Sequence, residues 1–273
     1  MRLGEVLRLA TEHLAKTSET ARLDAELLLA HVLGRSRIEL YTEFDRPLDE
    51  PELAAYRALI ARRARHEPVA YILGEWGFRR LNLLVDERAL IPRPETEIVV
   101  ERCLERLRGL GAPAVLDVGT GTGAIALAIA DEHPGARVTA IDLSSEALEL
   151  ARANAERSGV ELELLEHDLR GGLPGGPYDL VVSNPPYVEP GDLETLMPDV
   201  REYEPHVALV GVGATEAVAR AAREVLRPAG WLVFEVGEGQ AAQTLELLEG
   251  LGYAEGTVTR DLTGRDRVVE AQR

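Results

Sequence analysis

The segment Asn184-Pro185-Pro186-Tyr187 follows the apolar run 180–183, which is typical of a buried strand. Its residue types suit the recognition of a planar amino group. Two consecutive prolines remove two backbone donors and fix φ, so the segment is stiff and presents carbonyl groups without N–H groups. We therefore expect Asn184 and Pro185 to accept hydrogen bonds from an –NH₂ group. Tyr187 would cover one side of its plane, and Pro186 would complete the binding site.

A second motif lies upstream, where the predicted strand 114–118 runs into a glycine-rich turn and then a helix. Glycines let the backbone turn sharply and let a ligand approach it closely. The spacing is G-x-G-x-G and no lysine follows, which excludes a phosphate-binding P-loop. The alternative is a tight turn with no ligand. We expect cofactor contacts at Gly119, Thr120, Gly121, Thr122 and Gly123.

Two acids follow the next predicted strands, and both are candidates for cofactor contacts. Asp142 ends the second strand, where a carboxylate can accept hydrogen bonds from both hydroxyls of a ribose. Its alternative role is to cap the following helix. Asp168 follows the third strand and could accept a hydrogen bond from an adenine amine. For this residue a simple loop turn is an equally good interpretation.

Together the two motifs suit methyl transfer from S-adenosylmethionine to a planar nitrogen. When such a nitrogen attacks the methyl group of the sulfonium, positive charge moves onto the nitrogen. Carbonyl oxygens aimed at its hydrogens stabilise that charge, and by analogy with an oxyanion hole one such contact contributes about 2.7–4 kcal/mol. In-line positioning supplies further acceleration. No strong base is required, because the proton can leave after transfer. The alternative for 184–187 is a proline-rich loop that ends a strand.

The elements that must position these motifs change character along the chain. Helical periodicity dominates residues 1–66, and Ser36 could cap a short helix. We divide the chain into a helical domain, 1–68, a linker with a β-hairpin, 69–90, and a catalytic domain, 91–273. In the last, strands and helices alternate, which predicts an α/β fold with a mostly parallel, Rossmann-like sheet. Because only a turn separates the strands 253–258 and 267–271, we expect one of them to pair antiparallel at the edge.

Composition and charge limit the environment and the partners. The formal net charge is −17, and residues 1–80 carry 13 basic and 13 acidic side chains, so the whole excess lies in residues 81–273. Such a surface repels a phosphate backbone, and we expect no nucleic-acid partner. No apolar run is long enough for a membrane helix, and an acid stands at position 5, where a signal peptide would be apolar. We expect a cytoplasmic monomer.

Other residues that could do chemistry receive structural interpretations. Cys103 is the single cysteine, which excludes an intrachain disulfide, and we interpret it as a packing residue of the helix 94–108. The six histidines do not fall at metal-ligand spacing, so no metal is expected. Glu235 and Glu238 flank the end of the predicted strand 231–236 and could be taken for paired acids. We assign them loop and cap roles.

The assembled pattern resembles class I S-adenosylmethionine-dependent methyltransferases that modify planar nitrogens. The runs 91–97, 203–209 and 261–268, behind a helical N-terminal domain, narrow the resemblance to the HemK-type (PrmC) peptide chain release factor N5-glutamine methyltransferases. The resemblance covers essentially the whole chain. It implies that the substrate is the glutamine in the Gly-Gly-Gln motif of class 1 release factors. It also implies cofactor contacts at Gly119 to Gly123, Asp142, Asp168, Leu169 and Asn184.

Three other functions remain as alternatives. DNA adenine methyltransferases use the same Asn-Pro-Pro-Tyr logic on a flipped base, but the acidic catalytic half argues against them. A ribosomal-protein glutamine methyltransferase would differ only in its substrate. A non-catalytic cofactor-binding module would have lost pocket residues, whereas the glycines, the acid Asp142, Asn184 and Tyr187 are all present.

Overall fold

The computed structural model describes all 273 residues, which form two compact units. The helical unit consists of Met1–Glu75 together with Leu196–Tyr203. The catalytic unit consists of Trp76–Thr195 and Glu204–Arg273. The domain division 1–68, 69–90 and 91–273 stays a prediction beside these boundaries. No helix of either unit has the length and apolar character that a bilayer span requires.

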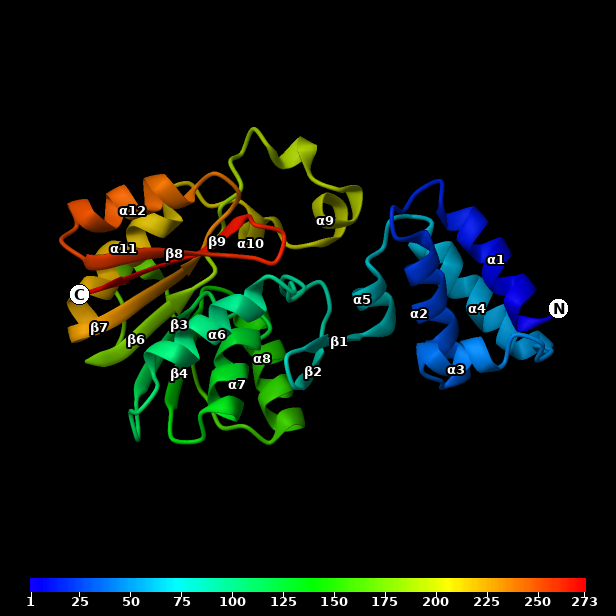
Figure 1. Ribbon diagram of the computed structural model, residues 1–273, viewed down its shortest axis with the longest axis horizontal. Helices are drawn as coiled ribbons and strands as arrows, with labels where there is room; N and C mark the ends of the chain where they lie inside the picture. The colour runs from blue at the N-terminus through cyan, green and yellow to red at the C-terminus, as the bar shows by residue number, and fades with distance from the viewer. The chain divides into compact units, whose positions relative to one another are not determined.

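The helical unit owes its elements to local signals that the sequence contains. Ser36 and Asp49 begin α3 and α4 with reciprocal capping boxes, which confirms the predicted cap at Ser36. Gly34 ends α2 in the left-handed conformation. The helices, visible in Figure 1, are α1 (Leu3–Leu14), α2 (Ala21–Leu33), α3 (Arg37–Thr42), α4 (Glu50–Arg63), α5 (Val69–Leu73) and α9 (Pro198–Tyr203).

A buried ion network joins α9 to the rest of the helical unit, although it lies far along the chain. Arg63 is 5% exposed and donates to Asp24 at 2.7 Å. The same guanidinium lies 3.4 Å from the carboxylate of Asp199. The Tyr203 hydroxyl donates to the carbonyl of Arg65 at 2.8 Å. A buried arginine needs such partners because an unpaired charge is costly to bury. This network explains why Leu196–Tyr203 belongs to the helical unit.

The catalytic unit is built on a seven-stranded sheet of order β5-β4-β3-β6-β7-β9-β8. Strands β3 to β7 are parallel, and β9 is antiparallel to both of its neighbours. The expectation of an antiparallel pairing at the edge is confirmed, because the edge strand β8 pairs antiparallel with β9, which lies inside the sheet. The strands are β3 (Ala114–Val118), β4 (Arg137–Asp142), β5 (Glu163–Glu166), β6 (Tyr178–Ser183), β7 (Leu226–Glu235), β8 (Ala254–Arg260) and β9 (Asp266–Gln272).

Helices cover both faces of this sheet, as predicted from the alternating pattern (Figure 1). Successive strand residues point to opposite faces. Val115 therefore packs in the cluster that contains α6 and α7, and Leu116 packs in the cluster that contains α11 and α12. Cys103 is buried in the first cluster, in agreement with a packing role. The helices are α6 (Thr96–Arg106), α7 (Ala124–Glu132), α8 (Ser145–Ser158), α10 (His206–Leu209), α11 (Ala214–Val225) and α12 (Ala241–Gly250).

A two-stranded hairpin, β1 (Glu75–Phe78) and β2 (Leu81–Leu84), precedes the sheet and confirms the predicted hairpin in the linker. The side chain of Asn154 in α8 fastens it to the glycine-rich turn. Asn154 is fully buried, accepts from the Leu84 N–H at 2.6 Å and donates to the Leu84 carbonyl at 3.0 Å. It also donates to the carbonyl of Thr122 at 2.9 Å. One buried amide thus holds the hairpin and the turn together.

The strand register brings the two sequence motifs to one edge of the sheet. Val118, the last residue of β3, pairs with Ile141 of β4 on one side and with Ser183 of β6 on the other. Ser183 pairs in turn with Phe234 of β7. The residues that follow these four positions therefore lie side by side at the carboxyl ends of the strands. They are Gly119, Asp142, Asn184 and Glu235.

Candidate active site

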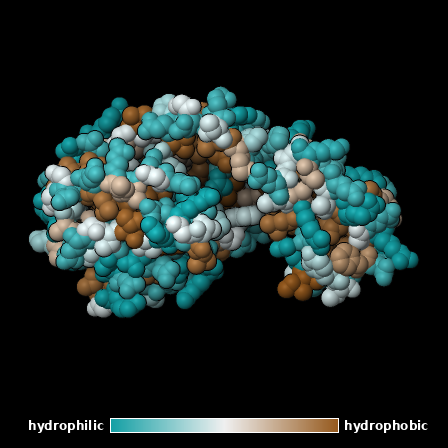
Figure 2. Space-filling model, turned by 45° about the horizontal axis from the view of Figure 1, so that its top comes forward, coloured by the Kyte–Doolittle hydropathy of each residue, from teal (hydrophilic) through white to brown (hydrophobic).

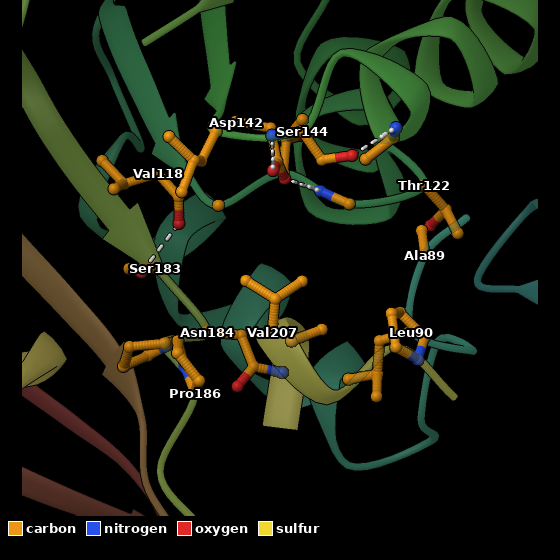
Figure 3. A pocket seen from close by; sticks show the side chains of 18 of the residues that line it. Ala89, Leu90, Val118, Thr122, Asp142, Ser144, Ser183, Asn184, Pro186 and Val207 are labelled. Atoms are coloured by element: carbon orange, nitrogen blue, oxygen red, sulfur yellow. Dashed lines mark hydrogen bonds between the residues drawn. The ribbon is translucent and has the colours of Figure 1, made fainter. Parts of the chain in front are cut away.

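A cavity of about 430 Å³ opens at the carboxyl ends of β3, β4 and β6. This is a volume typical of pockets for small ligands, and the carboxyl end of a parallel sheet is where such ligands bind. Figure 3 shows Asp142 and Ser144 across the cavity from Asn184 and Val207. Of the predicted site residues, those that line it are Gly119, Thr120, Gly121, Thr122, Asp142, Asp168, Leu169, Asn184, Pro185 and Pro186.

The cofactor side of the cavity is organised by the carboxylate of Asp142. One oxygen accepts from the N–H of Gly121 at 2.9 Å, and the other accepts from the N–H of Ser144 at 3.0 Å (Figure 3). Each carboxylate oxygen keeps a further lone pair, so Asp142 can still accept hydrogen bonds from a ligand. The residue therefore shapes the glycine-rich turn and faces the cavity at the same time.

The glycines of the turn have two different tasks. Gly119 has a φ of +75° and lines the cavity, and a Cβ added there would meet nothing within 4 Å. The backbone at this position is therefore open to a ligand. Gly123 has a φ of +82° and begins α7, but it does not line the cavity. A Cβ there would lie 3.2 Å from Leu127 and 3.3 Å from Ala151, so this glycine permits close helix packing. Its contact with a cofactor stays a prediction.

Asp117 lies under the same turn and was not among the predicted site residues. It is fully buried, and its carboxylate accepts from the hydroxyl of Thr120 at 2.7 Å. Burial raises the pKa of Asp117 to about 7. Asp117 lies two positions before Gly119 and thus supports the turn from below.

Asp168 lines the cavity, but its carboxylate already has a partner. Arg170 forms an ion pair with it, and this hydrogen bonding lowers the pKa of Asp168 to about 2. The side chain also accepts from the backbone N–H of Arg170 at 2.9 Å and caps the short 3₁₀ helix Leu169–Gly171. The carboxylate thus has the hydrogen bonds of a loop turn at the cavity wall, and contacts of Asp168 and Leu169 with an adenine stay predictions.

The acceptor side begins where β6 ends, and several contacts fix its backbone. The hydroxyl of Ser183 donates to the carbonyl of Val118 at 2.7 Å, which ties the ends of β6 and β3 together (Figure 3). Pro185 is buried, and Asn184 is half-buried. Pro186 lies so close to Gly211 that a Cβ on that glycine would be 2.4 Å from its ring. The segment 184–186 is therefore held rigidly at the cavity wall.

Tyr187 does not line the cavity, and its role against the substrate stays a prediction. Its carbonyl accepts from the side-chain amide of Gln240 at 3.0 Å, and Gln240 also accepts from the N–H of Gly237 at 3.1 Å. Burial, with the nearby carboxyl of Glu235, raises the pKa of the Tyr187 phenol. The aromatic ring is half-buried and lies beside Gly237, where an added Cβ would be 3.0 Å from it.

Two wall segments were not assigned to the site by sequence reasoning. Residues 88–93 and several positions in 205–210 line the cavity, and Figure 3 shows Leu90 and Val207 on its border. Glu204 is 4% exposed, pairs with Arg93 and lies 3.4 Å from the N–H of Ile91. Arg93 and Glu204 belong to the runs 91–97 and 203–209, on which the family resemblance rests. The sequence therefore singled out both segments, but it did not show that they are in contact.

Glu235 also has a place that differs from the expected one. It is the last residue of β7, is 3% exposed and accepts from the hydroxyl of Thr96 at 2.6 Å. A loop or cap role is therefore wrong for this residue, because its carboxyl group is buried beside the end of β6. Glu238 is exposed and lies 3.6 Å from Arg265, which agrees with a loop role.

Comparison with known protein families and solved structures shows what the chain is similar to. The family described as PrmC N-terminal domain matches residues 5–74, and the family described as methyltransferase small domain matches residues 96–199. Among solved structures, the ribosomal protein L11 methylase of Lactobacillus delbrueckii subsp. bulgaricus is 19% identical, with a TM-score of 0.52 over 73% of this chain and 97% of that one. This likeness shows the methyltransferase fold.

Curated relatives are far more similar in sequence. The release factor glutamine methyltransferase of Geobacter sulfurreducens is 45% identical, over 93% of this chain and 90% of the relative. That of Chlorobaculum tepidum is also 45% identical, over 92% and 90%. That of Vibrio cholerae is 42% identical, over 97% and 95%. These identities over nearly the whole length show that the chain belongs to the release factor glutamine methyltransferase family.

Proposed function

We propose that the protein transfers a methyl group from S-adenosylmethionine to the side-chain nitrogen of the glutamine in the Gly-Gly-Gln motif of class 1 release factors. One observation carries the proposal. A single cavity has Asp142 and the glycine-rich turn on one side and the amide of Asn184 on the other. A donor of methyl groups and a planar acceptor can therefore meet within it.

The residues on the first side fit the cofactor. The volume suits a ligand of this size, and Gly119 leaves its backbone accessible. The spare lone pairs of Asp142 can accept hydrogen bonds from ribose hydroxyls. When bound, S-adenosylmethionine supplies an electrophilic methyl group on a cationic sulfonium. Asp142 and the turn 119–122 would hold it.

The residues on the second side act on the acceptor amide. The side-chain oxygen of Asn184 and the carbonyl of Pro185 can accept the two hydrogens of an –NH₂ group. Both acceptors are fixed before the substrate arrives, so they stabilise positive charge on the nitrogen without reorganisation. The nitrogen becomes strongly acidic once it carries the methyl group and the positive charge. Its proton can therefore leave after transfer, and no strong general base is required.

We assign recognition of the release factor to the predicted helical domain, residues 1–68, which is part of the helical unit. Large apolar side chains are exposed on it, and Figure 2 shows such residues on its surface. Where exposed apolar side chains form a contiguous patch, they mark a protein-binding site. Ile38 in α3 is 78% exposed. Ile38→Asp should raise the KM for the release factor by about 5–30-fold, which corresponds to about 1–2 kcal/mol. It should leave the Kd for S-adenosylmethionine unchanged. An unchanged KM would remove Ile38 from the recognition surface.

The acidic catalytic half supports a protein substrate over a nucleic acid, and we expect a monomer that acts in the cytoplasm. The test is to offer S-adenosylmethionine with a labelled methyl group to purified release factor, adenine-containing duplex DNA and ribosomal protein in parallel. Label on the release factor alone is the expected result. Label on DNA or on ribosomal protein alone would replace the proposal by the corresponding alternative.

A further inference from the structure

Glu235 is a buried carboxyl group that the proposed chemistry does not use. It ends β7, and because Phe234 pairs with Ser183, Glu235 lies beside Asn184 at the carboxyl ends of the two strands. Its side chain is 3% exposed and does not line the cavity. Burying a carboxyl group is costly unless hydrogen bonds compensate. Its position next to the principal acceptor of the site therefore requires an explanation.

Two side chains act on the carboxyl group of Glu235. The hydroxyl of Thr96, the first residue of α6, donates to one carboxyl oxygen at 2.6 Å. Asn184 lies beside Glu235 through the pairing of Ser183 with Phe234, and its side chain favours the charged form of the carboxyl group. An ionised carboxylate can only accept hydrogen bonds, so the end of the Asn184 amide that it can hold is the –NH₂.

This constraint matters because an asparagine amide has two chemically opposite ends. If the amide rotates by half a turn, the –NH₂ end takes the place of the oxygen. Only the oxygen can accept a hydrogen from a substrate amide, and a donor in its place would repel developing positive charge. We propose that Glu235 is a positioning residue that holds the –NH₂ of Asn184 and thereby directs its oxygen toward the acceptor nitrogen. This inference rests on the proposed function of Asn184.

The groups around Glu235 determine how it responds to pH. Burial raises its pKa to about 6, and Glu95 acts in the same direction. Hydrogen bonding from Thr96, the charge of Arg267 in β9 and the side chain of Asn184 oppose this shift. Tyr187 is the other titratable group nearby. As the pH falls through about 6, the carboxyl group gains a proton and can donate, so it no longer selects one orientation of Asn184.

The test measures kcat at saturating S-adenosylmethionine between pH 5 and pH 8 in wild type and Glu235→Gln. A glutamine offers both an acceptor and a donor, so it tolerates either orientation of Asn184. We expect kcat at pH 7.5 to fall by about tenfold or more, with the Kd for S-adenosylmethionine within about twofold of wild type. The decline of kcat near pH 6 should disappear. Thr96→Val removes a bond that favours the charged form, so it should move that decline to higher pH.

The matched control is Glu270→Gln, since Glu270 is also a fully buried glutamate of this sheet but pairs with Arg102 and Arg106 outside the cavity. It should lower the thermal stability and keep the acid decline of kcat. An unchanged kcat and pH profile in Glu235→Gln would overturn the proposal, and so would a wild-type kcat that stays flat through pH 6. If wild type does not methylate the release factor at all, the proposed function fails instead.

Discussion

The two sides of the cavity are built in different ways. On the cofactor side the two acids contact residues that are close along the chain: Asp117 and Thr120 are 3 apart, and Gly121 and Asp142 are 21 apart. On the acceptor side the contacts are long-range, because Thr96 and Glu235 are 139 residues apart. Gln240 reaches Tyr187 across 53 residues.

This difference has consequences for substitutions. A cofactor site made from one turn and the next strand end is carried by a continuous segment, and changes there should affect mainly cofactor binding. The acceptor side depends on strands and helices that meet only in the folded sheet. Substitutions of residues that are distant in the sequence but contact the acceptor side should therefore alter turnover without changing the affinity for the cofactor.

The largest effect should come from Asn184→Ala, which removes the acceptor itself. The loss of one preorganised contact to developing charge costs about 2.7–4 kcal/mol, so kcat should fall by about 10²–10³-fold. The Kd for S-adenosylmethionine, measured by calorimetry, should be nearly unchanged. An unaltered kcat would exclude Asn184 from catalysis. A large rise in Kd would show that Asn184 also binds the cofactor, which contradicts the assignment of separate tasks to the two sides.

Asp142→Ala should have the converse effect. The substitution removes the acceptor for ribose hydroxyls and the bonds that shape the turn at Gly121 and Ser144. Hydrogen bonds to charged groups contribute about 1.5–3 kcal/mol, so the Kd for S-adenosylmethionine should rise by about 10–100-fold. Asp192, an exposed acid in a loop, provides the control Asp192→Ala, which should leave the Kd unchanged. A Kd for Asp142→Ala that equals the wild-type value would refute the role of Asp142.

Gln240→Ala tests the long-range side with a smaller effect. It deletes the bonds to the Tyr187 carbonyl and the Gly237 N–H and leaves the cavity lining intact. Each such bond contributes about 1 kcal/mol, so kcat should fall several-fold. Steady-state kinetics at saturating S-adenosylmethionine would measure it. If the Kd for the cofactor changed and kcat did not, the proposed independence of the two sides would be wrong.

Much of the site could be predicted because its residues stand directly after strands. Asp142 and Asn184 end apolar runs, and the carboxyl ends of parallel strands meet at one edge. The role of Glu235 could not be predicted, since an acid at a strand end is equally typical of a cap, and its burial depends on Thr96, far along the chain. Gly123 could not be distinguished by sequence from Gly119 and Gly121, although in the structure it permits close helix packing.

The limits of the fold prediction have the same origin. Helix caps and strand periodicity are local, so α3 and most of the strands could be placed from the sequence. The interior position of β9 could not, because two short strands joined by a turn fit either order at the edge of a sheet. The assignment of α9 to the helical unit depends on the buried Arg63 and its contact with Asp199, and nothing local in 196–203 indicates it.

The central claim is that acceptor oxygens at Asn184 and Pro185 direct methylation to an amide nitrogen. The most direct measurement is tandem mass spectrometry of a class 1 release factor after reaction with S-adenosylmethionine and this protein, with a second sample in which the Gly-Gly-Gln glutamine is replaced by alanine. We expect one methyl group on the side-chain nitrogen of that glutamine in the first sample and none in the second. A methyl group on another residue, or one that persists after the replacement, would contradict the account.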